Sequence, residues 1–232
     1  CEFFVCEDHL NKNSKDNGYQ VVLLAKNKNG YHNLAKLSSK AYTDGFYYVP
    51  RIDKKLILEY KEDLMVLTGN LYGEVPSKVL NVGEHQAEEA LLWWKSHFGS
   101  DLYIELMRHA NQENENRVND VLIRFSKDHG VKLVATNNTY YADKSDANAH
   151  DILLCVNTGE SKYTPKGHGK GFRFGFPNNE FYFKSQAAMK QLFSDVPNAI
   201  ENTMAIADKV KGIHLERDIP VLPKFSIPEG FE

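Results

Sequence analysis

Residues 102–135 read LYIELMRHANQENENRVNDVLIRFSKDHGVKLVA, and this stretch decides the fold class. Two short apolar runs, 102–107 and 132–135, are typical of buried strands. The segment between them carries apolar residues at helical spacing: Val118, Val121, Leu122 and Phe125. Gly130 is placed to end that helix. A strand, a helix and a second strand in this order predict a parallel pair with a helical crossover.

The same alternation extends in both directions along the chain. Further strands are predicted at 1–5, 21–25 and 64–67, and further helices around 31–42, 87–98 and 149–156. A last long helix is expected to be capped by Asp195, with Pro197 in its first turn. Alternating strands and helices predict an α/β fold with a parallel sheet or barrel. An open doubly wound sheet is the competing architecture, and periodicity alone does not separate the two.

Composition narrows the class of protein. With 232 residues, the chain is long enough for one large domain or two small ones. The net charge of -3 argues against broad, non-specific nucleic-acid binding by this chain alone. Its three cysteines are too few and too scattered for a disulfide framework. The sequence has no apolar run of membrane-spanning length and no signal-peptide pattern, so we expect a cytoplasmic protein with reduced thiols.

Candidate functional residues lie just past two predicted strands. His109 follows 102–107, and Asn138 and Tyr140 follow 132–135. With Glu2 in the first strand, His109 could share a metal ion that activates water for phosphoester hydrolysis. Two ligands are fewer than the three that catalytic zinc normally takes. From pattern alone, a surface loop residue is the ordinary interpretation of His109, and a paired strand residue that of Glu2.

The segment 164–179 is rich in Gly, Pro and basic residues, and we expect a mobile loop there. A second interpretation is a loop that touches nucleic acid by charge and stacking. Its contacts would be Lys166, Lys170 and Arg173, with Phe172 and Phe174 for stacking.

Several motifs together resemble one family. They are CEFFV at 1–5, LLAKN at 23–27, GYHNL at 30–34, GFYY at 45–48, PRID at 50–53, GEVP at 73–76, ATN at 135–137 and AHDILLC at 149–155. Over essentially its whole length the chain resembles the polymerase-and-histidinol-phosphatase (PHP) segment of bacterial DNA polymerase III alpha subunits. The resemblance implies an incomplete, distorted seven-stranded (β/α) barrel whose N-terminal strands lie upstream of Cys1. It also implies a PHP domain over 1–212 and an extended linker over 213–232 towards a palm domain.

Only some of the family's metal ligands have a matching residue in this chain. Glu2 and His109 match a glutamate and a histidine ligand of the family's metal trio, which holds zinc or manganese. Family ligands are replaced at Gln20, Asn138 and Tyr140, and the family's H-x-H motif would lie upstream. Amides are weak ligands, and a phenol must lose a proton with a pKa of about 10 to bind a metal strongly. A degenerate metal site without catalytic residues is therefore expected.

The resemblance implies a role in DNA replication. The leading hypothesis is a non-catalytic structural and partner-docking domain of the replicase. The alternative is a metal-dependent phosphoesterase or 3'-5' exonuclease. The parent protein would be a DNA-directed DNA polymerase, a nucleotidyltransferase that uses magnesium in a palm outside this chain. Implied partners are the proofreading exonuclease, the sliding clamp and DNA, all through the full-length chain, with no membrane. An exposed barrel edge also predicts a dimer.

Overall fold

The computed structural model describes residues 1–110, 112–167 and 169–214, and it confirms an α/β fold. The linker expected at 213–232 therefore lies, from residue 215 onwards, outside the described residues. The strands are β1 (Glu2–Cys6), β2 (Tyr19–Ala25), β3 (Arg51–Asp53), β4 (Leu64–Leu67), β5 (Leu102–Leu106) and β6 (Lys132–Ala135). The helices are α1 (Lys28–Thr43), α2 (Lys54–Glu59), α3 (Glu74–Asn81), α4 (Glu84–Phe98), α5 (Glu113–His129), α6 (Ala147–Thr158), α7 (Gln186–Leu192) and α8 (Pro197–Lys209), with 3-10 turns at Gly99–Asp101 and Lys144–Asp146.

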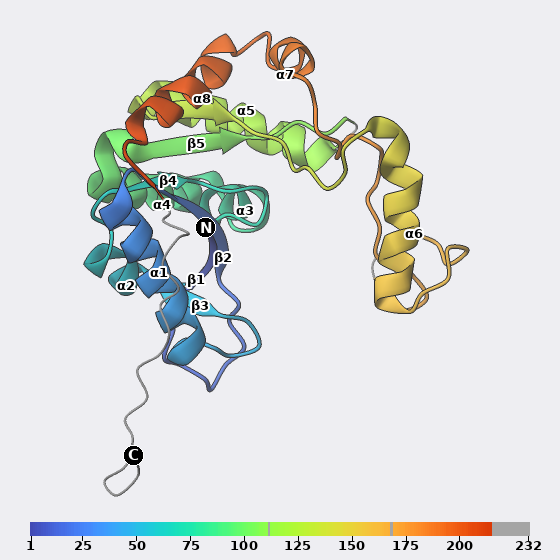
Figure 1. Cartoon of the computed structure of the whole chain (residues 1–232), viewed down its shortest axis with the longest axis horizontal. Coiled ribbons are helices and arrows are strands. Elements are labelled where there is room, and N and C mark those ends of the chain that lie inside the picture. The colour runs from blue at the N-terminus through green and yellow to red at the C-terminus, as the bar shows by residue number, and fades with distance from the viewer. Residues whose placement is uncertain (111, 168, 215–232) are drawn as a thin grey trace, which may run out of the picture.

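The strands form one six-stranded mixed sheet in the order β3-β1-β2-β4-β5-β6. The β1–β3, β4–β5 and β5–β6 pairs are parallel, and β5–β6 is the pair predicted from 102–135. The prediction of an all-parallel sheet is wrong for β2, which runs antiparallel to β1 and β4. Residues 7–18 contain no α-helix, so the chain returns beside β1 as in a hairpin instead of crossing over. This mixed sheet with flanking helices agrees with a partial, distorted barrel (Figure 1).

Side chains alternate between the two faces of the sheet, and the larger core lies on the face covered by helices. Leu102, Ile104 and Leu106 of β5 point into that core. The opposite face carries a smaller apolar cluster of Met65, Leu67, Tyr103 and Val134. Helix α8 packs on β6, where Asn202 Nδ2 donates to the Leu133 carbonyl at 2.8 Å. This contact covers one edge of the sheet.

The N-terminal cap of the last helix, α8, differs from the sequence prediction. Asp195 was expected to cap the last helix, but the N-cap residue of α8 is Val196, with Pro197 at the first turn as predicted. Asp195 instead forms an ion pair with Arg108, at 2.5 Å between Nη1 and Oδ1. The Asp195 carboxylate therefore links the residues just before α8 to the loop after β5.

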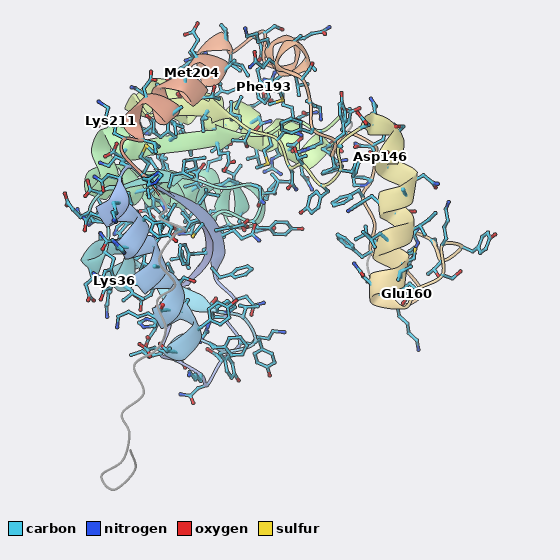
Figure 2. All side chains as sticks on the ribbon, viewed as in Figure 1. Lys36, Asp146, Glu160, Phe193, Met204 and Lys211 are labelled. Carbon is cyan, nitrogen blue, oxygen red and sulfur yellow. The ribbon has the colours of Figure 1, made fainter. Side chains whose placement is uncertain are left out.

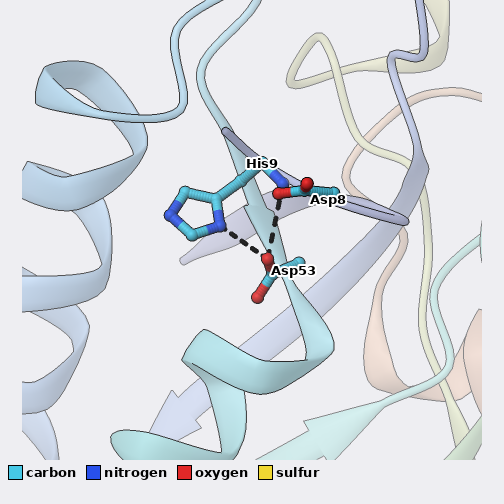
Figure 3. Close-up of side chains that lie close together, drawn as sticks. All are labelled: Asp8, His9 and Asp53. Atoms are coloured by element: carbon cyan, nitrogen blue, oxygen red, sulfur yellow. Dashed lines mark hydrogen bonds and ion pairs between the residues drawn. The ribbon is translucent and has the colours of Figure 1, made fainter. Parts of the chain in front are cut away.

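The loop at 7–18 is fixed by one fully buried cation. Arg51 has no exposed surface, and its guanidinium donates to four backbone carbonyls, those of His9, Asn11, Asp16 and Gly45. Two residues later, Asp53 caps α2 through Oδ1 and accepts from His9 Nδ1 through Oδ2 at 2.6 Å (Figure 3). The PRID motif thus closes the β1–β2 loop and starts the next helix.

Helix α6 stands apart from the sheet on an arm formed by the segments before and after it (Figure 1). Figure 2 shows Asp146 and Glu160 at the two ends of this helix, far from Phe193 and Met204. The two segments at the base of the arm are joined by backbone hydrogen bonds from Tyr140 N to the Phe181 carbonyl and from Phe183 N to the Tyr141 carbonyl, both 2.9 Å. Among the described residues, no helix is long and apolar enough to cross a membrane.

Candidate functional site

Five of the positions singled out in the sequence line one cavity of about 500 Å³, among them Lys166 and Phe174 of the 164–179 segment and three that follow strands. These three are His109 after β5, and Asn138 and Tyr140 after β6. Because β4, β5 and β6 are parallel, their carboxyl ends lie at the same edge, and the loops that follow them form one wall. The first turns of α5 and the arm form the rest of the lining, through Gln112, Glu115, Phe174, Phe176 and Phe181.

Glu2 and Gln20 do not line this cavity. Glu2 is exposed at the start of β1, opposite Val22, and Gln20 lies opposite Phe4. Since β2 runs against its neighbours, the beginning of β2 lies at the functional edge, where Gln20 N donates to the Tyr72 carbonyl at 2.9 Å. The buried Oε1 of Gln20 has no hydrogen-bond partner among the described residues. Gln20 is thus near the cavity but outside its wall.

His109 is buried, with 4% of its surface exposed, so its interpretation as a surface loop residue is wrong. Its Nδ1 lies 2.8 Å from Glu115 Oε1, and its backbone N–H donates to Glu115 Oε2. The ring stacks on Phe181 at 4.4 Å between centroids and 9° between planes. Nε2 is left without a hydrogen-bond partner in the described part of the chain. The carboxylate of Glu115 therefore fixes the imidazole with Nε2 as its free nitrogen.

Glu105 is a site residue that the sequence reasoning missed. It lies on β5 on the same face as Tyr103, is 6% exposed, and accepts from Thr136 Oγ1 at 2.6 Å through Oε1. Its Oε2 is buried and has no partner among the described residues. Burial raises the pKa of this carboxyl, and the charge of Glu2 adds to the effect. The available signal was a glutamate inside an otherwise apolar strand, LYIEL.

A column of stacked rings joins the cavity to the arm. It consists of His109, Phe181, Phe176 and His150, with successive centroids 4.4, 4.4 and 5.2 Å apart and interplanar angles of 9, 22 and 19°. Tyr140 packs against Phe176 at 4.6 Å. These rings come from segments that are distant in the sequence, so no local pattern could predict their assembly.

Among the described residues, few free metal-ligating atoms lie at the strand ends. Within residues 1–110, 112–167 and 169–214, three metal-ligating atoms lie within 4.8 Å of one another only at Asp8 and His9 of the 7–18 loop and Asp53 at the end of β3 (Figure 3). There the carboxylate of Asp53 is already used as a helix cap and as the partner of His9. The cavity offers the free atoms of Glu105 and His109, next to the neutral side chains of Asn138 and Tyr140.

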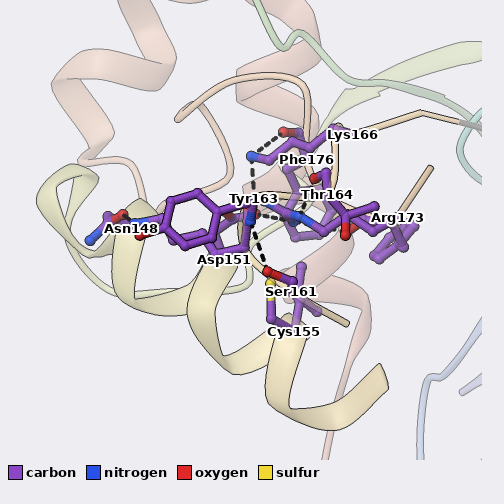
Figure 4. A network of polar contacts seen from close by, with 12 residues as sticks. Asn148, Asp151, Cys155, Ser161, Tyr163, Thr164, Lys166, Arg173 and Phe176 are labelled. Carbon is purple, nitrogen blue, oxygen red and sulfur yellow. Dashed lines mark hydrogen bonds and ion pairs between the residues drawn. The ribbon is translucent and has the colours of Figure 1, made fainter. Parts of the chain in front are cut away.

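The basic residues of 164–179 are mostly used within the arm. Arg173 is 4% exposed and forms two bonds with Asp151, at 2.9 Å (Nη1–Oδ1) and 2.8 Å (Nη2–Oδ2) (Figure 4). Lys166 lies 3.0 Å from Asp151 Oδ1 and also donates to the Phe176 carbonyl. Lys170 is exposed, as are Phe172 and Phe174. Of the three basic residues predicted to touch nucleic acid, Arg173 is therefore enclosed by its own loop.

Comparisons with known proteins agree with the fold. The model of the family described as "PHP domain" matches residues 1–109. The chain is 40% identical to the DNA polymerase III subunit alpha of Borreliella burgdorferi over 99% of its own length and 19% of the relative. It is 38% identical to that of Campylobacter jejuni over 97% of the chain and 19% of the relative, and 37% identical to that of Treponema pallidum over 100% and 20%. The chain thus spans about a fifth of the length of these relatives.

Proposed function

This chain belongs to the DNA polymerase III alpha subunit family and contains its PHP domain, and from that premise we propose that it is a structural and partner-docking part of a replicative polymerase. The PHP domain is proposed to cover 1–212, because the sheet and α8 continue well past residue 109. The polymerase reaction, its magnesium ions and its contact with DNA would belong to the remaining length of the full protein.

The observation that carries this proposal is the set of donors in the cavity. Glu105 and His109 provide one free atom each, and the other positions that match family ligands hold an amide or a phenol. A hydrolytic zinc site normally uses three protein ligands with anionic or imidazole donors. The described residues of the cavity offer two such donors, and Asn138 and Tyr140 add only neutral groups.

Metal content and nuclease activity together test the proposal. The chain is purified without chelator and analysed for zinc, manganese and iron, and then assayed on a 3'-labelled oligonucleotide with added Mn²⁺. We expect far less than one metal ion per chain and no cleavage. Stoichiometric metal with cleavage that His109→Ala abolishes, and that the exposed-site control His32→Ala retains, would contradict the docking role.

A second candidate function, a metal-dependent phosphoesterase, is favoured by one specific feature. Glu115 holds His109 in the arrangement by which carboxylates orient metal-binding histidines, and Nε2 is left free. Such a site would bind a divalent ion through Nε2 and Glu105. Isothermal titration with Mn²⁺ separates the two functions, since the docking role predicts no saturable heat that depends on His109.

The partners of the full-length protein are proposed to include the proofreading exonuclease, the sliding clamp and DNA, in the cytoplasm. A dimer through a sheet edge is proposed with one restriction. Because α8 packs on β6, the other edge, the three-residue β3, is the one left for pairing. Light scattering of the purified chain at high concentration tests this, and a strict monomer would rule the dimer out.

A further inference from the structure

The cavity at the strand ends has two buried polar atoms that its own walls leave unsatisfied. Glu105 and His109 are 6% and 4% exposed, and Glu105 Oε2 and His109 Nε2 have no partner among the described residues. Buried polar atoms are nearly always hydrogen-bonded to protein, water or a ligand, so these two atoms mark where a ligand with matching groups can bind. The cavity, at about 500 Å³, is within the size range of small-molecule sites.

The remaining walls are suited to a flat ring. Four aromatic side chains line the cavity, those of Tyr140, Phe174, Phe176 and Phe181, and the apolar Met107, Val118 and Leu122 line it as well. Stacking on aromatic side chains is the general way in which proteins hold unpaired bases, because every base has a π face. Phe181 and Phe176 already have a stacked ring on each face, so a ring ligand would stack on Tyr140 or Phe174, which also line the cavity.

We propose that this cavity binds a nucleobase by stacking, with the base's amino or ring N–H groups directed at Glu105 Oε2 and His109 Nε2. Because Nδ1 of His109 faces the Glu115 carboxylate, Nε2 is the ring nitrogen left to face a ligand in the cavity. A base edge with an exocyclic amine supplies the donor that these atoms lack.

This binding involves no bond making or breaking and needs no partner protein. It rests on the proposed function in one respect, namely that metal ions do not occupy the same two atoms. The tests are therefore run in the presence of a chelator. Metal bound to the purified chain would contradict the docking role. Absence of base binding in the presence of a chelator would contradict the nucleobase site.

Adenosine, N6,N6-dimethyladenosine and ribose are the probes, and saturation-transfer NMR with the chain is the measurement. We expect transfer to the base protons of adenosine, none to ribose, and at least about fivefold weaker binding of the dimethylated analogue, which has lost its donor. This ligand-side comparison uses one unaltered protein, so it does not depend on the folding of any variant.

Two variants locate the site. Glu105→Gln replaces the carboxylate with a neutral amide and should weaken adenosine binding about tenfold, the difference expected between a charged and a neutral acceptor. Glu201→Gln removes an exposed carboxylate on α8 and should leave the affinity unchanged. Thermal melts establish that both variants are folded. No transfer to adenosine, equal affinity for the dimethylated analogue, or unchanged affinity in folded Glu105→Gln would each overturn the inference.

Discussion

The carboxylate of Asp151 on α6 accepts hydrogen bonds from both terminal nitrogens of Arg173, which lies 22 residues later in the chain. Both residues are buried, at 9% and 4% exposure. The pair joins α6 to the loop that returns from it (Figure 4), together with the Lys166–Asp151 pair and the stacking of His150 on Phe176. Residues 164–179, expected from their composition to be mobile, are held at this point by a buried charge.

Asp151→Asn should release the loop from α6. Removing one member of a buried ion pair leaves the other charge unpaired, so we expect amide hydrogen exchange in α6 to become at least about tenfold faster. The sheet should keep its protection. The matched control is Glu84→Gln, which breaks the exposed pair with Arg124 and should change little. Equal protection of α6 in both variants would show that the Asp151 pair does not hold the arm.

The same pair makes the arm sensitive to acid. The hydrogen bonds from Arg173 and Lys166 hold the pKa of Asp151 at about 2, below its usual 3.8. A carboxyl with a lowered folded pKa contributes stability above its unfolded pKa and loses it as the pH falls. We therefore expect peptic cleavage within 144–180 to rise between about pH 4 and pH 2. Asp151→Asn should already be cleaved at pH 4, and a parent arm equally cleaved at pH 4 would contradict the prediction.

Glu115 is predicted to stabilise the loop that carries His109. Glu115→Ala removes the partner of the His109 Nδ1 and of its backbone N–H, and buried donors without partners are costly. We expect the free energy of unfolding, measured in urea, to fall by about 2 kcal/mol. Glu113→Ala, an exposed carboxylate in the same first turn of α5, should cost less than about 0.5 kcal/mol. Similar losses in the two variants would mean that the His109 contacts add nothing.

Arg51 is predicted to be indispensable for the β1–β2 loop. Arg51→Met fills a similar volume but leaves four backbone carbonyls without their donor. We expect a loss of more than about 2 kcal/mol in the free energy of unfolding and faster hydrogen exchange in 7–18. Lys12→Ala, in the same loop but exposed, serves as the control. Unchanged exchange in Arg51→Met would show that the loop is held by other contacts.

Strong local periodicity made most of the fold predictable. The runs 64–67 and 132–135 became β4 and β6 with the same bounds, and Gly130 and Gly159 end α5 and α6 in the left-handed conformation. The three-residue strand β3 was missed because it is too short to show alternation. The direction of β2 was also missed, although the missing helix between 5 and 21 is the feature that requires a hairpin-like return.

Site residues could be predicted from the sequence only where they directly follow a predicted strand. Positions just past β5 and β6 reach one cavity because parallel strands end at one edge, so His109, Asn138 and Tyr140 were found. Glu105 was passed over because it lies inside a strand, where its direction depends on pairing. The contacts of Phe176 and Phe181 depend on how the arm folds back, and the pairing of Arg173 with Asp151 depends on it too.

The reversed direction of β2 has a consequence for how the chain tolerates insertions. Its pairing sets Phe4 against Gln20 and Glu2 against Val22. Side chains alternate strictly along a strand, so a slip of one residue in β2 would exchange its two faces. Val21 and Leu23 would leave the helix-covered core, and Gln20 would enter it. An inserted residue in 7–18 is therefore harmless only if the loop bulges to absorb it.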